Sequence, residues 1–234
     1  MGHTIGILVA MDKELELLKT IVDANLEQKK IGNEYFDFWF GYTNAAKTGE
    51  TITIIIAKSG IGKANAAMMM TALINIYNVD YIISSGVCGS IYSNVEEYHQ
   101  GTVVCGSSAR YHDVWCGDPN ETGQIQDLPV SFNLRIPDFS DFAVKECRFL
   151  TGDWFVGKED AQKIVEKFGA DYCIDMESAA IASVCYRTNV PLTCIRIISD
   201  TPLDEKAPTY EDFWVKAPNT LVGVVKYIID FKTF

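Results

Sequence analysis

Long hydrophobic runs, basic clusters and paired cysteines are all scarce in this sequence. No apolar run approaches the ~20 residues that a membrane-spanning helix needs. The chain opens with only a short apolar run, Ile5 to Ala10, which lacks the basic lead-in and cleavage site of a signal peptide. We therefore predict no membrane association and a cytoplasmic location.

Metal-binding and disulfide signatures are also missing. The seven cysteines include no C-x-x-C pair, and several lie in apolar stretches where a thiol behaves as a small hydrophobe. We expect them to be reduced. The three histidines are too few and too dispersed for a histidine-rich metal site. The sequence therefore predicts neither a metal nor a cofactor.

The balance of charge disfavours nucleic acid as a partner. The 31 acidic residues outnumber 20 scattered Lys and Arg residues, and the net charge of -11 would repel a polyanion. A hydrophobic content of 48% with 22% charged residues is ordinary for a globular protein. At 234 residues, we expect one domain spanning residues 1–234.

Hydrophobic periodicity predicts strands interspersed with helices, which favours an α/β sheet covered on both faces. Consecutive strand-like runs before Lys58 indicate that part of the sheet is antiparallel. Strands are expected at Thr4–Met11, Tyr35–Phe40, Thr51–Lys58, Asp80–Ser85, Gly101–Ser107 and Leu192–Ile198. Helices are expected at Asp12–Val22, Lys63–Ile76, Lys158–Phe168, from Ile174 to a stop at Asn189 and Pro191, and at Tyr210–Asp230 with an interruption near Pro218.

Three acids occupy positions where open α/β sheets place their ligands. Glu14 and Glu177 are predicted in first helical turns, and Asp200 ends a buried strand. Each acid alone also has an ordinary structural interpretation, because acids favour first helical turns and Asp is common where a strand exits into a turn. Their combination predicts carboxylates that approach one crevice.

Two glycine-containing segments, Ser59–Lys63 and Gly86–Ser90, follow strands and are predicted to form turns. Glycine lets backbone amides approach a ligand closely, although turn geometry alone would explain the same residues. The segment from Trp115 to Pro137 is rich in Gly, Pro, Asn and Asp and predicts a long excursion. Such loops are usually functional or partner-facing.

Seven motifs carry a resemblance to a known family. In order along the chain they are G-I-L-V-A-M-D-K-E, S-G-I-G-K, S-G-V-C-G, A-R-Y-H-D, T-G-D-W-F, D-M-E-S-A-A-I-A and R-I-I-S-D. Together they resemble the nucleoside phosphorylase and nucleosidase superfamily, most closely the methylthioadenosine and S-adenosylhomocysteine nucleosidases. The resemblance covers nearly the whole chain. It implies a three-layer α-β-α sandwich around a mixed, partly parallel sheet, a homodimer, and cleavage of the bond between adenine and ribose.

The resemblance implies a role for each acid. Asp200 is similar to the general acid that protonates the adenine ring, with Ser199 steadying its carboxyl, and Glu14 is similar to the base that activates water, which Arg196 helps to hold. This assignment agrees with the chemistry. Cleavage builds positive charge on the sugar and negative charge on the leaving base, so an acid belongs at the base and carboxylates near the sugar.

The remaining implied contacts surround the nucleoside. Glu177 resembles a clamp on the ribose hydroxyls while Met176 packs on the sugar. Phe155 resembles the stacking surface for adenine, and backbone groups at Val156 resemble those that read its edge. Three further positions, Met11, Ile61 and Tyr210, match residues that close over the group on the far carbon of the sugar.

That outer pocket is apolar, so it would suit a thioether and disfavour a phosphate. The excursion near Trp115 and Pro129 resembles a part that a neighbouring subunit contributes to it. The resemblance thus implies hydrolysis of 5′-methylthioadenosine and S-adenosylhomocysteine to adenine and a thioribose.

Three alternatives stay open from the sequence: a purine nucleoside phosphorylase, a nucleosidase for another modified purine nucleoside, and a non-catalytic nucleoside-binding protein. Phosphorylases of this superfamily place arginines near the first strand end and the second glycine segment, whereas all five arginines here come later in the chain. A nucleosidase for another modified purine nucleoside, or a non-catalytic nucleoside-binding protein, could use the same fold.

Val87 departs from the Ser or Thr usual in the family, and loss of that hydroxyl could lower activity or shift substrate choice.

Overall fold

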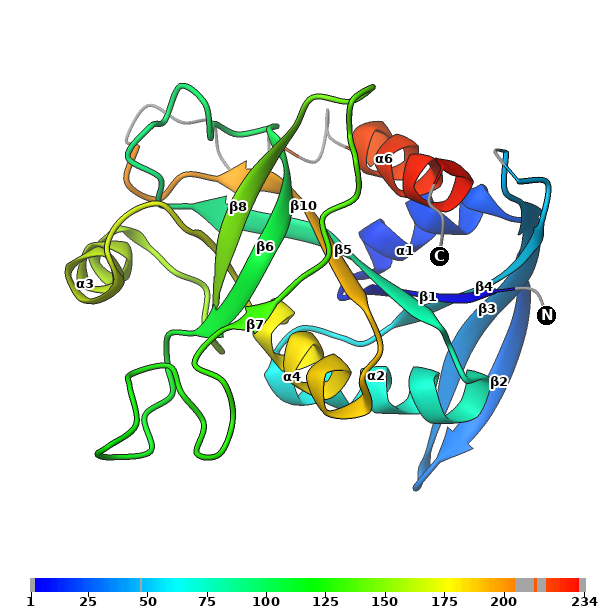
Figure 1. The fold of residues 1–234 in the computed structure, drawn as a ribbon, viewed down its shortest axis with the longest axis horizontal. Coiled ribbons are helices and arrows are strands. Elements are labelled where there is room, and N and C mark those ends of the chain that lie inside the picture. The colour runs from blue at the N-terminus through cyan, green and yellow to red at the C-terminus, as the bar shows by residue number, and fades with distance from the viewer. Residues whose placement is uncertain (1–2, 47, 205–212, 214–217, 232–234) are drawn as a thin grey trace.

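The computed structural model describes residues 3–46, 48–204, 213 and 218–231. Their ten strands belong to one sheet with helices on either side (Figure 1). The strands are β1 (Thr4–Val9), β2 (Asn25–Ile31), β3 (Glu34–Asn44), β4 (Thr51–Lys58), β5 (Tyr81–Ser90), β6 (Val103–Tyr111), β7 (Phe132–Asn133), β8 (Val144–Thr151), β9 (Cys173–Asp175) and β10 (Leu192–Asp200). The helices are α1 (Asp12–Leu18), α2 (Lys63–Tyr77), α3 (Lys158–Phe168), α4 (Ser178–Thr188) and α6 (Pro218–Phe231), with a 3₁₀ turn at Lys19–Ile21.

The sheet is mixed, as predicted. Its order is β10-β6-β8-β9-β5-β1-β4-β3-β2, with β7 beside β6, and a further pairing of β10 with β5 closes one end of the sheet on itself. β4, β1, β5 and β10 pair in parallel, whereas β2, β3 and β4 form an antiparallel meander. Because β1, β5 and β10 run in the same direction, their carboxyl ends point to one edge of the sheet, where Leu8 of β1 lies opposite Ser84 and Asp200 of β10 lies opposite Gly89.

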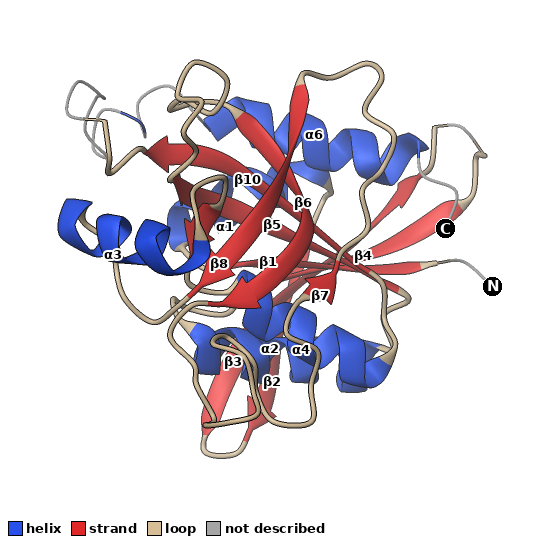
Figure 2. Ribbon diagram, turned by 60° about the vertical axis from the view of Figure 1, so that its left-hand side comes forward, coloured by secondary structure: helices blue, strands red, loops and turns tan. Residues whose placement is uncertain are grey.

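Helices cover both faces of the sheet, which confirms the predicted layered α/β fold. α1 and α6 lie on one side and α2 and α4 on the other, as Figure 2 shows. A buried cluster on each side joins the helices to the strands, with Leu15 and Val225 in one and Met70 and Ile181 in the other. A third cluster joins α3 to the ends of β8 and β9. No helix in the described ranges is long and apolar enough to cross a membrane.

Three predicted segments differ clearly in length from the observed ones. β5 and β6 run on to Ser90 and Tyr111, so the glycine segment Gly86–Ser90 is strand rather than turn. The strand continues because β10 pairs beside it up to the last residue, with Asp200 opposite Gly89. The predicted helix Asp12–Val22 keeps α-helical geometry only to Leu18 and then tightens into the 3₁₀ turn.

One further element begins elsewhere than predicted. The chain from Ile174 first forms β9, and α4 starts only at Ser178, so Glu177 is the residue that precedes the helix. The predicted helix Tyr210–Asp230 is described as α6 from Pro218 onward, the position of its predicted interruption. Tyr210, its predicted start and a predicted site residue, lies outside the described residues.

Candidate active site

A cavity opens where β1, β5 and β10 end. It holds about 680 Å³ free of protein atoms, a volume that includes the open solvent at its mouth. Nine of the eleven predicted site residues line it: Met11, Glu14, Ile61, Phe155, Met176, Glu177, Arg196, Ser199 and Asp200. Val156 lines an adjoining recess that shares Phe155, Met176 and Asp200 with the cavity. The three predicted acids therefore face one space.

Glu14 is the third residue of α1, and its side chain turns back to the residues that join β1 to α1. Its side chain is buried, and Oε2 accepts hydrogen bonds of 2.9 Å from the backbone amides of Ala10 and Met11. Burial raises the pKa of Glu14 above its usual range, while those amides, the charge of Arg196 and the backbone of Val87 oppose the rise. A carboxyl with a raised pKa at the floor of a cavity suits a general base.

Two glycines of β5 make room for two of the acids. A Cβ atom at Gly86 would lie 2.7 Å from Oε1 of Glu14, and a Cβ atom at Gly89 would lie 3.0 Å from Oδ2 of Asp200. Neither glycine has a positive φ, so the backbone does not require glycine for its conformation. The glycines are needed for space because the carboxylates occupy the volume of a side chain.

We expect Gly86→Ala to keep the fold but to lower turnover of the substrate on the order of 10²-fold. The added methyl meets the movable end of the Glu14 side chain, and displacement of a catalytic group by ~1 Å has effects of this size. The control is Gly223→Ala in α6, where the new Cβ meets nothing closer than 4.0 Å. Steady-state kinetics with thermal unfolding would check this, and an unchanged rate for Gly86→Ala would contradict the spatial role.

Asp200 ends β10 beside Ser199. The Ser199 hydroxyl lies 2.6 Å from Oδ1 of Asp200 and 3.2 Å from the carbonyl oxygen of Cys88, so it can hold the carboxyl in one orientation. Burial raises the pKa of Asp200, and the hydrogen bond from Ser199 partly offsets the rise. The environment thus favours the protonated form that a general acid requires.

Glu177 lies between β9 and α4. Its Oε1 accepts a 2.9 Å hydrogen bond from the backbone amide of Gly62, the residue that precedes α2. Burial, and next the negative charge of Asp175, raise the pKa of Glu177 to about 7. Near neutral pH this carboxyl therefore gains or loses its proton readily, and a cationic ligand would favour the ionised form.

Asp175 is a buried residue of the site that the sequence reading missed. It pairs with Arg196 at 3.1 Å and accepts hydrogen bonds from Thr151 and Ser178. The nitrogens Nη1 and Nη2 of Arg196 donate to Ser84, Ile195, Asp175 and Ser178. An arginine within a buried strand needs a carboxylate partner, and that rule could have identified Asp175 from the sequence.

Apolar side chains form the remaining walls. Met11, Met176 and Ile61 line the cavity, and Phe155 lies at its mouth with 68% of its surface exposed. An exposed aromatic ring beside an acid offers a stacking surface for a planar base. The site thus combines an apolar enclosure with four carboxyl groups. Glu14 is in the first turn of α1, Glu177 precedes α4 and Asp200 ends β10, whereas Asp175 is paired with Arg196.

Comparison with known proteins gives consistent results. Residues 4–230 match the family model described as the phosphorylase superfamily. The 5′-methylthioadenosine/S-adenosylhomocysteine nucleosidase of Staphylococcus aureus is 33% identical over an alignment of 224 residues that covers 91% of this chain and 93% of the relative.

Solved structures agree along nearly the full length. The nucleosidase of Neisseria meningitidis in complex with methylthio-immucillin-A superposes with a TM-score of 0.81 at 29% identity, covering 97% of this chain and 98% of that one. The Helicobacter pylori enzyme, solved as an aspartate-to-asparagine variant with 5′-methylthioadenosine in its active site, gives 0.80 at 26% identity, covering 98% and 99%. This chain belongs to the phosphorylase superfamily, in the family of the 5′-methylthioadenosine/S-adenosylhomocysteine nucleosidases.

Proposed function

We propose that this protein hydrolyses the N-glycosidic bond of 5′-methylthioadenosine and S-adenosylhomocysteine, releasing adenine and a thioribose. One observation carries the proposal: Glu14, Glu177 and Asp200 line a single, largely apolar cavity. The names of the similar proteins support the choice of substrates. Adenine release by the purified protein tests it, and binding of either nucleoside without release would favour a nucleoside-binding protein instead.

Each carboxyl has a step that suits its surroundings. Protonated Asp200 donates to a ring nitrogen of adenine as the bond breaks, and Glu14 removes a proton from the attacking water. Ionised Glu177 accepts hydrogen bonds from the sugar hydroxyls and stabilises the positive charge that develops on the ring. If Glu14 and adenine lie on opposite faces of the sugar, the first sugar product has inverted stereochemistry.

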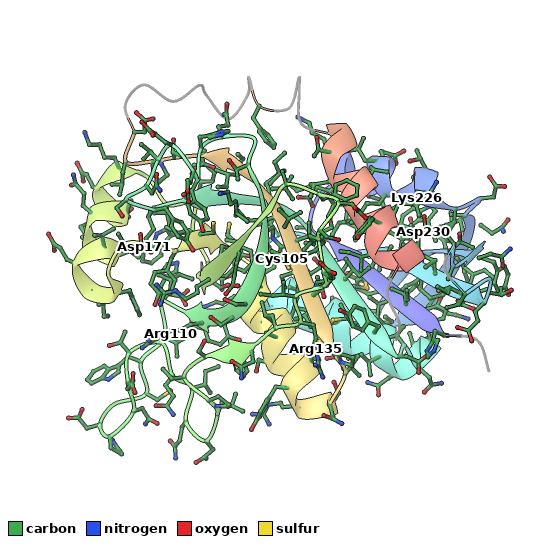
Figure 3. All side chains as sticks on the ribbon, turned by 45° about the horizontal axis from the view of Figure 1, so that its top comes forward. Cys105, Arg110, Arg135, Asp171, Lys226 and Asp230 are labelled. Atoms are coloured by element: carbon green, nitrogen blue, oxygen red, sulfur yellow. The ribbon has the colours of Figure 1, made fainter. Side chains whose placement is uncertain are left out.

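Water is a better nucleophile than phosphate for this cavity. Arg196 is the one arginine or lysine that lines it among the described residues, and its charge is balanced by Asp175 at 3.1 Å. Arg110 and Arg135 are labelled in the lower half of the view in Figure 3, and neither lines the cavity. A bound phosphate would therefore face carboxylates without an available cation. Arg196 acts through its charge on Glu14 in this proposal.

Glu177→Gln should lower kcat/KM about 10- to 100-fold, because a charge-assisted hydrogen bond to the ribose is lost. In the wild-type protein kcat/KM should fall as the pH drops below about 7, where Glu177 gains a proton. The variant should lack this limb of the pH profile. If the wild-type protein used sugars without the diol as efficiently as normal substrates, Glu177 would not be a ribose clamp.

The active form is proposed to be a homodimer. Phe155 and Ile61 at the cavity mouth are 68% and 52% exposed, and Trp115 in the long excursion is 65% exposed. Apolar side chains around a ligand site favour coverage by another surface, here a second copy that contributes its 115–137 excursion. Sedimentation should give twice the 26.1 kDa of one chain, and a monomer that retains full activity would contradict the proposal.

A cytoplasmic location is proposed from the cysteines. All seven are free thiols and six are buried, including Cys105, which lies near the centre of the molecule in Figure 3. Unpaired thiols in this number fit a reducing compartment. Fractionation of cells that produce the protein tests this location, which recovery from an oxidising compartment would contradict.

A further inference from the structure

A charged cluster outside the cavity joins three elements near its mouth. Lys63 is the first residue of α2, Asp113 follows β6, and Asp153 follows β8. The Lys63 Nζ atom lies 2.6 Å from Oδ2 of Asp113 and 3.6 Å from Oδ2 of Asp153. Asp113 Oδ2 also accepts a 2.9 Å hydrogen bond from the backbone amide of Asp153. The proposed chemistry assigns no role to these three residues.

The cluster is more than a surface ion pair. The side chains of Lys63 and Asp113 are only 20% and 12% exposed. The partial positive charge at the start of a helix repels a lysine in the first turn. The negative charges of the two aspartates offset this repulsion. The backbone amide of Lys63, one of the unpaired amides of that turn, donates a 2.7 Å hydrogen bond to Oδ1 of Asp153. Asp153 therefore caps α2 from a distant part of the chain.

This cap fixes a backbone group that meets the site. Gly62 directly precedes Lys63, and its amide donates the 2.9 Å hydrogen bond to Glu177. A Cβ atom at Gly62 would lie 3.2 Å from Oδ1 of Asp153, so the aspartate is in close contact with this turn. A shift of Lys63 relative to Asp153 would therefore move the adjoining Gly62 amide, which bonds to Glu177.

The same cluster also adjoins two residues that line the cavity. Phe155 lies two residues after Asp153, and Ile61 lies two residues before Lys63. Both residues line the cavity. The ion pairs thus tie together two segments that border the mouth, the 59–63 loop and the 152–155 segment.

We propose that Lys63, Asp113 and Asp153 are positioning residues for ribose recognition, acting through the Gly62 amide on Glu177. The cluster sets the distance between the 59–63 loop and the 152–155 segment, and so orients the Glu177 carboxyl toward the sugar. This inference rests on the proposed function, because it assigns the cluster to that site.

The test is Lys63→Met, assayed for adenine release from 5′-methylthioadenosine. We expect kcat/KM to fall about 10-fold, mostly through a higher KM, because ground-state and transition-state binding of the sugar weaken together. Lys63→Arg should restore most of the loss. The matched control is Lys163→Met in α3, which removes an exposed 3.0 Å ion pair with Asp160 and should leave both constants unchanged.

A double-mutant cycle separates positioning from folding. In a Glu177→Gln background, Lys63→Met should have less than about a twofold further effect, because the group through which it acts is already altered. Asp153→Ala changes a half-exposed position and should raise KM in the same way. It replaces Lys63→Met as the test if that variant does not fold. Thermal unfolding of each variant measures its fold independently.

Two results would overturn the positioning role. One is a lower melting temperature with unchanged kcat and KM, and the other is full additivity of Lys63→Met with Glu177→Gln. Wild-type protein assayed in parallel distinguishes this failure from failure of the proposed function. If the wild-type protein releases no adenine, the proposed function fails and the positioning role fails with it.

Discussion

Asp200→Asn should lower the rate of adenine release by about 10²- to 10⁴-fold, the usual contribution of a positioned general acid. An asparagine side chain keeps the size and the hydrogen bond with Ser199, 2.6 Å from the carboxyl oxygen, but it has no acidic proton to donate. Nucleoside binding should therefore change little. Calorimetric binding of 5′-methylthioadenosine beside single-turnover kinetics would measure both quantities.

The pH profile gives a second readout for Asp200. Burial raises the pKa of its carboxyl, so the wild-type rate should fall as the pH rises through that value. The variant has no carboxyl at this position and should lack this limb in whatever rate remains. Retention of the full rate by Asp200→Asn would remove Asp200 from the acid role, whereas loss of binding would indicate a structural defect.

Glu14→Gln should have an effect of similar size, about 10²- to 10⁴-fold on hydrolysis, because the water loses its general base. A glutamine oxygen can still accept the 2.9 Å hydrogen bonds from Ala10 and Met11, so the turn after β1 should keep its shape. Nucleoside binding serves as the control. Hydrolysis at the wild-type rate would show that another group activates the water.

The same variant should be more stable than the wild-type protein at neutral and higher pH. The pKa of Glu14 is raised in the folded protein, so the folded state binds this proton more tightly than the unfolded chain does. Stability is therefore lost as the pH rises from the unfolded value of about 4.3 through the raised folded value. The substitution removes this dependence because an amide does not titrate. The gain in melting temperature should vanish below about pH 4.

The general architecture could be predicted because buried elements leave strong patterns. The predicted strand Thr51–Lys58 and helix Lys158–Phe168 coincide with β4 and α3. β2 was not predicted, because this edge strand is half exposed and its sequence, N-L-E-Q-K-K-I, carries charges that mask any alternation. Its pairing with β3 depends on tertiary contacts that local sequence does not record.

The candidate site was predicted from topology more than from local pattern. Glu14, Glu177 and Asp200 were each placed beside the end of a strand, and all three line the cavity. The predicted glycine turn at Gly86–Ser90 was wrong, because glycine indicates either a turn or a close approach by another group. Here Gly86 and Gly89 serve the second purpose, and only the fold shows which carboxylates approach them.

Contacts between residues far apart in the chain are the other feature that could not be predicted from the sequence. Asp175 and Arg196 are 21 positions apart, and Lys63 is 90 positions from Asp153. Their contacts arise because β9 and β10 flank β5, and because α2 begins beside the end of β8. A single sequence can indicate that a buried arginine needs a carboxylate, but it does not show which residues the fold brings together. The roles of the individual site residues stay predictions until the variants are measured.

The most direct test of hydrolysis is to incubate the purified protein with 5′-methylthioadenosine in phosphate-free buffer made with ¹⁸O-labelled water. We expect adenine and a free methylthioribose that carries one ¹⁸O atom, formed at a rate that added phosphate does not change. A sugar phosphate that appears only when phosphate is present would contradict the account and establish phosphorolysis. Absence of adenine under both conditions, with binding intact, would identify a nucleoside-binding protein.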